Sequence, residues 1–370
     1  MTQMLVLVHG MGTSPAGWSD EPGGPKAKLN AVAKQYGAFK TGPAFCDRLV
    51  VREIAYDDCF ATLVNQWQAK STELAKFALS AQRPLPKLVD WLDRSLPMSE
   101  AAAKQFFWST ASDPLLYRGF ALVRDRVRVA VMSQLVSLLK NAGPQAINVT
   151  VVAHSLGTAV MHDVLHLLGN GVLPDAVKDV EVLLPSRWKF ANLFMIADVC
   201  LLGPPATRDI DPFASIVRPV MPDGSRDGYC RKFFEVWHRF DPFAILAPFR
   251  PGDWGKGYRP IGPLAHFRSA NVHGFAHYLD HPAVHIPLIN FALGEEAITA
   301  REEAAALGAY ADIVAPECGQ QIGRLKTKAT EFAGVGDDLQ DLVIKIAEFY
   351  ALARDAGANC QGISDALGGF

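Results

Sequence analysis

The sequence lacks the features that mark membrane-spanning and nucleic-acid-binding chains. No apolar run approaches the roughly 18 residues that a membrane-spanning helix needs. No basic block stands out, and 36 lysines and arginines nearly balance 38 aspartates and glutamates. We therefore expect neither a transmembrane segment nor a nucleic-acid partner. With 49% hydrophobic and 20% charged residues, the chain has the composition of a well-packed globular protein.

Paired cysteines and a signal peptide are also missing. The six cysteines are scattered without a C-x-x-C pair, which favours reduced thiols in a chain of 370 residues. The opening MTQMLVLVHG lacks the basic start and the cleavage site of a signal peptide. These features predict a cytoplasmic location, and export by a route without a signal peptide would leave the same pattern.

The most informative stretch is Ile147 to Leu165, INVTVVAHSLGTAVMHDVL. A β-branched apolar run leads into Ala153-His154-Ser155-Leu156-Gly157, and a helical pattern follows. A strand, a tight turn and a helix with serine at the apex is the context that a G-x-S-x-G nucleophile requires. Small residues flank the serine because strand and helix approach closely there. Ser155 is the candidate nucleophile, and the N–H group of Leu156 is one candidate donor to an oxyanion.

A second turn follows the predicted strand Leu5 to Val8, at His9-Gly10-Met11-Gly12. A dinucleotide fingerprint would need glycine where Pro15 stands, so that reading is poor. The alternative is a His-Gly turn whose backbone faces the nucleophile, which makes the Met11 N–H the second oxyanion donor. Trp18 either lines the pocket or packs for stability.

The remaining pattern predicts an α/β fold with a mostly parallel, doubly wound sheet. Further strands are expected at Arg48–Ile54, Ala191–Val199, Phe233–His238 and His266–Val272, and helices at Asp113–Lys140 and Pro282–Leu293. A helical insertion over about 60–112 is either a lid or ordinary core. A tail rich in Ala, Glu, Lys and Leu begins at Glu295 and predicts two or three helices, which pack on the core, form an oligomer or bind a partner.

Serine needs a base and the base needs an acid, and two acids compete for that role. Asp241 precedes a proline at the end of the next-to-last predicted strand. Asp198 ends the intervening strand, closer to Ser155 in sheet order. We favour Asp241 because it stands two strands after the nucleophile, although Asp-Pro can also simply start a turn.

Two histidines compete for the base. His273 directly follows the last predicted strand, and His277 is expected in the loop after it, which favours His277. His273, His277, His281 and His285 repeat every four residues and would form a metal-binding face on one continuous helix. Gly274 and Pro282 argue against such a helix, and His266 is the only other histidine nearby, so we expect no metal site.

Four segments together resemble the serine α/β-hydrolase superfamily, in particular its bacterial lipase- and esterase-like members. They are VTVVAHSLGTAVMHDVL, LVLVHGMG, FEVWHRFDPFA and HGFAHYLDHPAV. The resemblance covers about residues 1–295, the expected α/β-hydrolase core, and excludes the extension 296–370. It implies a triad of Ser155, Asp241 and His277. Such proteins often place the histidine three residues before a tyrosine, a position held here by Phe275.

The resemblance implies hydrolysis of a small-molecule or lipid carboxylic ester through an acyl-enzyme, without metal or organic cofactor. Acyl transfer and thioester or amide cleavage use the same kind of site, so they stay open. An interaction scaffold with an inactive site is the alternative from another class.

Overall fold

The computed structural model describes residues 2–10, 14–60, 117, 121–142, 147–172, 185, 188–201, 209–220, 228–239, 241, 243–244, 248–266, 272–310 and 327. Four sequence-based expectations therefore lie wholly or mostly outside the described residues: the helical insertion beyond residue 60, the helices beyond residue 310, the placement of Met11, and the strand expected at His266–Val272.

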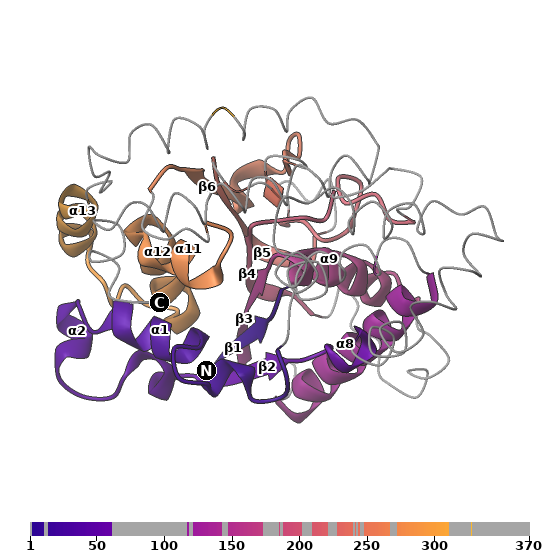
Figure 1. The fold of residues 1–370 in the computed structure, drawn as a ribbon, viewed down its shortest axis with the longest axis horizontal. Coiled ribbons are helices and arrows are strands. Elements are labelled where there is room, and N and C mark those ends of the chain that lie inside the picture. Colours follow the sequence, from indigo (N-terminus) through magenta and orange to yellow (C-terminus); the bar gives the residue numbers. More distant parts are fainter. Residues whose placement is uncertain are drawn as a thin grey trace, which may run out of the picture.

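A single six-stranded sheet, all parallel, forms the centre of the molecule (Figure 1). Its strands are β1 (Thr2–Val8), β2 (Val50–Ile54), β3 (Ile147–His154), β4 (Phe190–Ile196), β5 (Cys230–His238) and β6 (Tyr258–Leu264), in the spatial order β2-β1-β3-β4-β5-β6. Because the strands are parallel, the loops after β1, β3, β5 and β6 leave from the same edge.

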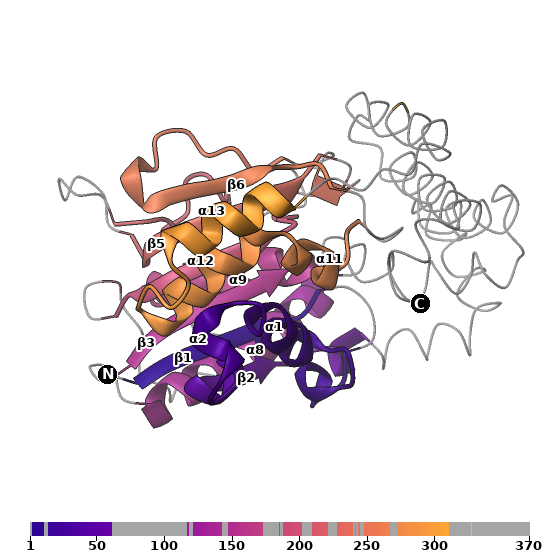
Figure 2. The same cartoon turned by 90° about the vertical axis from the view of Figure 1, so that its left-hand side faces the viewer.

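Helices cover both faces of the sheet (Figures 1 and 2). One face packs against α8 (Ala121–Ala142) and α9 (Leu156–Gly169). The other packs against α1 (Pro25–Ala33), α11 (Phe275–Asp280) and α12 (Pro282–Leu293). Shorter or peripheral helices are α2 (Gly37–Lys40), α13 (Ala300–Ala309) and the 3-10 turns η1 (Trp18–Asp20), η2 (Phe45–Arg48) and η6 (Gly255–Gly257). The expected α/β architecture is confirmed at this level.

The period-two pattern of β1 explains why both faces are covered. Met4, Val6 and Val8 point into the core beside α8 and α9, whereas Leu5 and Leu7 point into the opposite core. An alternating strand of apolar residues is stable only when both of its faces are buried. Helix α8 buries an apolar stripe, which consists of Val123, Val127, Val131, Leu135 and Leu139.

A buried ion pair fastens α8 to α9. Arg128 on α8 donates from Nη2 to Asp163 on α9 at 2.6 Å, and it bonds both carboxylate oxygens of Asp209 at 2.7 Å. Tyr117 donates its hydroxyl to the same Asp163 carboxylate at 2.6 Å. Burial alone would lower the pKa of Arg128, but the two carboxylates raise it, so the guanidinium stays charged. The helix that begins at Ser155 is therefore held by charge as well as by packing.

The sixth strand does not lie where the sequence predicted a strand, and the expected last strand, His266–Val272, is described only at its two ends, because residues 267–271 lie outside the described part of the chain. The sixth strand is Tyr258–Leu264, and neither His266 nor Val272 lies in a strand. Strand β6 contains Pro260, Gly262 and Pro263, which break the sequence pattern of a strand. It tolerates two residues without an N–H because it pairs with β5 alone in the described sheet. Among the described helices, none is both long and apolar enough to cross a membrane.

Candidate active site

Ser155 occupies a strained turn between β3 and α9. Its backbone has φ 54° and ψ −127°, a conformation that L residues other than glycine seldom adopt. The Ser155 N–H donates to the Ile196 carbonyl at 2.9 Å, which fixes the turn to the neighbouring strand. The geometry agrees with the strand–turn–helix context that the sequence predicted for this serine.

Two glycines allow the backbone to come this close. A Cβ atom on Gly10 would lie 2.7 Å from the Cβ of Ser155, and one on Gly157 would lie 2.3 Å from the His9 carbonyl oxygen. Neither distance is possible between non-bonded atoms. The turn after β1 therefore lies directly against Ser155, as the sequence predicted for the His-Gly segment.

The side chain of Tyr56 fixes that turn. Its hydroxyl donates to the His9 carbonyl at 2.7 Å, its backbone N–H donates to His9 Nε2 at 3.2 Å, and the two rings stack with centroids 4.0 Å apart. His9 in turn donates Nδ1–H to the Gly10 carbonyl at 2.8 Å. Burial lowers the pKa of His9 to about 4, so this ring is neutral at neutral pH.

A hydrogen-bonded chain links Ser155, His273 and Asp241. His273 Nε2 lies 2.6 Å from Ser155 Oγ, and His273 Nδ1 lies 2.8 Å and 3.0 Å from the two carboxylate oxygens of Asp241. Because a carboxylate only accepts, Nδ1 carries the proton and Nε2 accepts from the serine hydroxyl. All three side chains are buried.

Asp241 is held by donors on every side. Tyr278 donates its hydroxyl to Oδ2 at 2.6 Å, and the N–H groups of Phe243 and Ala244 donate to Oδ1 at 3.0 Å and 3.4 Å. Burial alone would raise the pKa of Asp241, but the adjacent His273 and these side-chain hydrogen bonds hold it below its ordinary value. Asp241 thus has two roles: it starts a turn, and it orients His273.

The other two candidate residues, His277 and Asp198, contact other side chains. The expectation that His277 contacts Ser155 is therefore corrected. His277 belongs to α11, not to a loop, and its ring stacks on His266 with centroids 4.1 Å apart. Burial and the neighbouring histidines hold the pKa of His277 well below its ordinary value. Asp198 pairs with His162, at 3.2 Å, and accepts from the Cys200 N–H at 2.8 Å. Neither side chain has a hydrogen bond to the chain of Ser155, His273 and Asp241 among the described residues.

Sequence reasoning missed His154, the residue before Ser155. Its Nε2–H donates to the backbone carbonyl of His273 at 2.7 Å, which ties the end of β3 to the loop that carries the histidine. The rings of His154 and His273 lie with centroids 5.1 Å apart. A histidine in the variable position of a small-x-Ser-x-Gly pattern gives no sign of such a contact.

A cavity of about 210 Å³ lies beside the turn after β1. Gly10, Trp18, His154 and Phe275 contribute to its lining, so Trp18 does line a pocket. A larger cavity of about 630 Å³ lies at the amino ends of β3, β4 and β5, beside Asn148, Asn192 and Arg231. We assign chemistry to the smaller cavity because Gly10 and His154 line it and both lie next to Ser155, and because parallel sheets bind ligands at the carboxyl ends of their strands.

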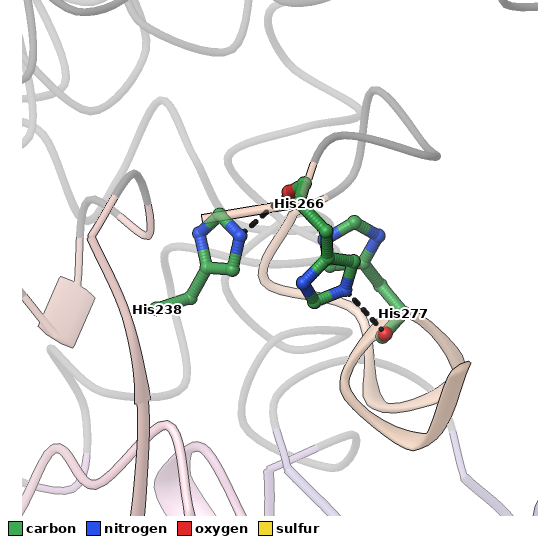
Figure 3. A group of neighbouring side chains, drawn as sticks. All are labelled: His238, His266 and His277. Carbon is green, nitrogen blue, oxygen red and sulfur yellow. Dashed lines mark hydrogen bonds between the residues drawn. The ribbon is translucent and has the colours of Figure 1, made fainter. Parts of the chain in front are cut away.

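The arrangement supplies the parts of a nucleophilic site. A neutral histidine with an orienting carboxylate can take the proton of a serine hydroxyl, whose free pKa is too high for attack at neutral pH. The N–H of Leu156 is the first of α9, where backbone donors have no partner within the helix. Among the described residues, two buried groups bring potential metal-binding atoms close together: His238 with His266 and His277 (Figure 3), and His162 with Asp198 and Cys200.

Comparisons with protein-family models, with curated proteins and with solved structures find no match to this chain.

Proposed function

We propose that the protein is a serine hydrolase of the α/β-hydrolase kind that cleaves carboxylic esters. The observation that carries the proposal is the hydrogen-bonded chain from Ser155 through His273 to Asp241 at the carboxyl edge of a parallel sheet. The chain order of serine, acid and histidine is the one that α/β-hydrolases use. The substrate is a small-molecule or lipid ester.

In this mechanism Ser155 attacks the acyl carbon while His273 Nε2 takes the hydroxyl proton. The carbonyl oxygen becomes an oxyanion, which the Leu156 N–H and the N–H of Met11 stabilise. His273 then gives the proton to the leaving alcohol, and an acyl-enzyme forms on Ser155. Water, deprotonated by His273, releases the acid. Asp241 keeps the proton of His273 on Nδ1 throughout and stabilises the imidazolium.

The decisive experiment is labelling with a fluorophosphonate, which reacts with activated serines. We expect one label per chain, on Ser155, with loss of p-nitrophenyl ester hydrolysis as the label accumulates. The variant Ser155→Ala is the matched control and should take up no label. Hydrolysis by Ser155→Ala at the wild-type rate, or labelling of another serine, would refute the proposal.

The same preparation separates esterase from the other reactions. A labelled protein that turns over thioesters, amides or an acceptor alcohol faster than simple esters would have the proposed site and a different preferred reaction. A folded protein that takes up no label would be a scaffold with an inactive site.

His154 provides a test of positioning. We expect His154→Phe to lower kcat for ester hydrolysis by about 10- to 100-fold, because the loop that carries His273 loses its bond to β3 and small displacements of a base are costly. His154→Gln keeps an N–H donor and should recover part of the rate. The KM should change little in both variants. An unchanged kcat in His154→Phe would show that the bond does not position His273.

A further inference from the structure

A second cavity, larger than the one beside Ser155, lies at the opposite edge of the sheet. Its volume is about 630 Å³, and it lies between the amino ends of β3, β4 and β5 and the carboxyl-terminal half of α12. About 20 water molecules would occupy this volume, and sites for small molecules fall in the same range. The proposed hydrolase mechanism uses none of the residues that line it.

The sheet is polar on the face that borders this cavity. Asn148 and Thr150 on β3 and Asn192 on β4 alternate so as to face α12, although parallel strands covered on both faces are normally apolar along their length. Asn192 Nδ2 donates to Thr150 Oγ1 at 2.9 Å and to the Phe291 carbonyl at 3.1 Å. Asn192 Oδ1 and the amide group of Asn148 form no hydrogen bond within the described part of the chain, so both can bind a ligand.

Lys232 provides a positive charge on the same face. It pairs with Asn192 in the register of β4 and β5, and it lines the cavity. Its Nζ lies 3.8 Å from the centroid of the Phe291 ring, and no carboxylate of the described residues forms an ion pair with it. Partial burial and the nearby Arg259 lower the pKa of this ammonium group. Both effects oppose the charged form, so an anionic group bound in the cavity would stabilise it.

The segment after α12 provides negative charge. Glu295 follows that helix, Glu303 lies in the first turn of α13, and both line the cavity. Helices α12 and α13 cover the same face of the sheet (Figure 2). Neither glutamate forms an ion pair among the described residues. The carboxyl end of α12, which Gly294 terminates, adds the negative end of a helix dipole. The cavity thus has a cation on β5 and anions beside α12 that do not pair with each other.

We propose that this cavity binds a small zwitterion of the amino-acid or dipeptide class. The carboxylate of the ligand pairs with Lys232, and its ammonium group pairs with Glu295 and Glu303. The amide group of Asn148 and the Oδ1 atom of Asn192 bond the polar atoms between those charges. A ligand with one kind of charge alone would leave the other set of protein charges without a partner. The site lies at the opposite edge of the sheet from the proposed active site, so the inference does not rest on the hydrolase activity.

The test is calorimetric titration of the full chain with four compounds: L-alanine, L-glutamate, L-arginine and glycyl-L-leucine. We expect at least one of them to bind one equivalent per chain with a Kd below about 1 mM. The N-acetylated form and the C-terminal amide of that compound should each bind more weakly by about 10-fold or more, because each lacks one charge. Lys232→Met should weaken binding by about 10- to 100-fold. Lys256→Met is the matched control, because Lys256 is exposed in η6.

Further variants separate the outcomes. Lys232→Arg keeps the charge and should keep most of the affinity, and Glu303→Gln decides the matter if Lys232→Met does not fold, since it removes a charge at the other end of the ligand. Ser155→Ala should bind normally, which separates this proposal from the proposed function. The absence of saturable binding of all four compounds by the folded wild-type chain at about 10 mM overturns the proposal. So does equal affinity for the blocked and free forms, or an unchanged affinity in folded Lys232→Met.

Discussion

His273→Ala is expected to lower kcat/KM for ester hydrolysis by about 10⁴- to 10⁶-fold. The ring bonds both Ser155 Oγ and the Asp241 carboxylate, so the variant loses the proton acceptor of the nucleophile and the acid of the leaving group together. Hydrolysis of a p-nitrophenyl ester measures the loss. Fluorophosphonate labelling should slow in parallel because it needs the same activated hydroxyl.

His277→Gln is the matched comparison. The His277 ring lies against His266 rather than Ser155, so its replacement affects the site only through small displacements, and we expect at most about a 100-fold loss. Circular dichroism verifies that both variants are folded. If a folded His277→Gln lost as much activity as His273→Ala, the assignment of the base to His273 would be wrong.

Arg128→Met should lower the free energy of unfolding by about 3–5 kcal/mol, the usual cost of leaving one member of a buried ion pair without its partner. Asp163 is buried, and without Arg128 its remaining described side-chain hydrogen bond is that from Tyr117. The helix that begins at the nucleophile would lose its attachment to α8. Urea denaturation, compared at equal slope, measures the change.

Two further variants isolate the cause. Arg126 lies on the exposed side of the same helix, so Arg126→Met should change stability by less than about 0.5 kcal/mol. Adding Asp163→Asn to Arg128→Met removes the uncompensated charge while keeping a partner for Tyr117, and should recover part of the loss. A double variant less stable than Arg128→Met would show that the buried charge is not the source of the cost.

Strands β1 to β5 and the turn at Ser155 could be predicted because they rest on local patterns. A β-branched run, a small-x-Ser-x-Gly turn and an amphipathic helix each leave a signature within a few residues. Helix α12 has the bounds predicted for it, since Pro282 begins it and Gly294 ends it in a left-handed conformation. The predicted acid, Asp241, lies where the sheet order suggested.

The histidine could not be chosen from the sequence because its position depends on one glycine. His277 was expected in a loop, but Gly274 is the N-cap of helix α11, which contains His277. His273 precedes the cap and so lies outside the helix, facing Ser155. His277, one turn into the helix, is directed toward His266 and His238. The preference for His277 as the partner of Ser155 therefore depended on a short helix that the sequence did not predict.

No sequence pattern indicated the histidine cluster that His238, His266 and His277 form either. The four-residue repeat from His273 to His285 is interrupted where α11 ends and α12 begins, as the sequence indicated. Only His277 of that repeat enters the cluster. Its partners His238 and His266 come from the ends of different strands, and their proximity follows from the pairing of β5 with β6. Strand β6 itself was hidden by its prolines.

The surroundings of Asp241 determine its chemistry before any substrate arrives. Four donors converge on the carboxylate: His273, Tyr278 and two backbone N–H groups. An amide has one acceptor oxygen, so an asparagine here would turn its own N–H₂ toward a donor in either orientation. A protonated acid would meet the same conflict. The fold thus selects an anion at this position, and its negative charge is part of the folded state rather than a response to the reaction.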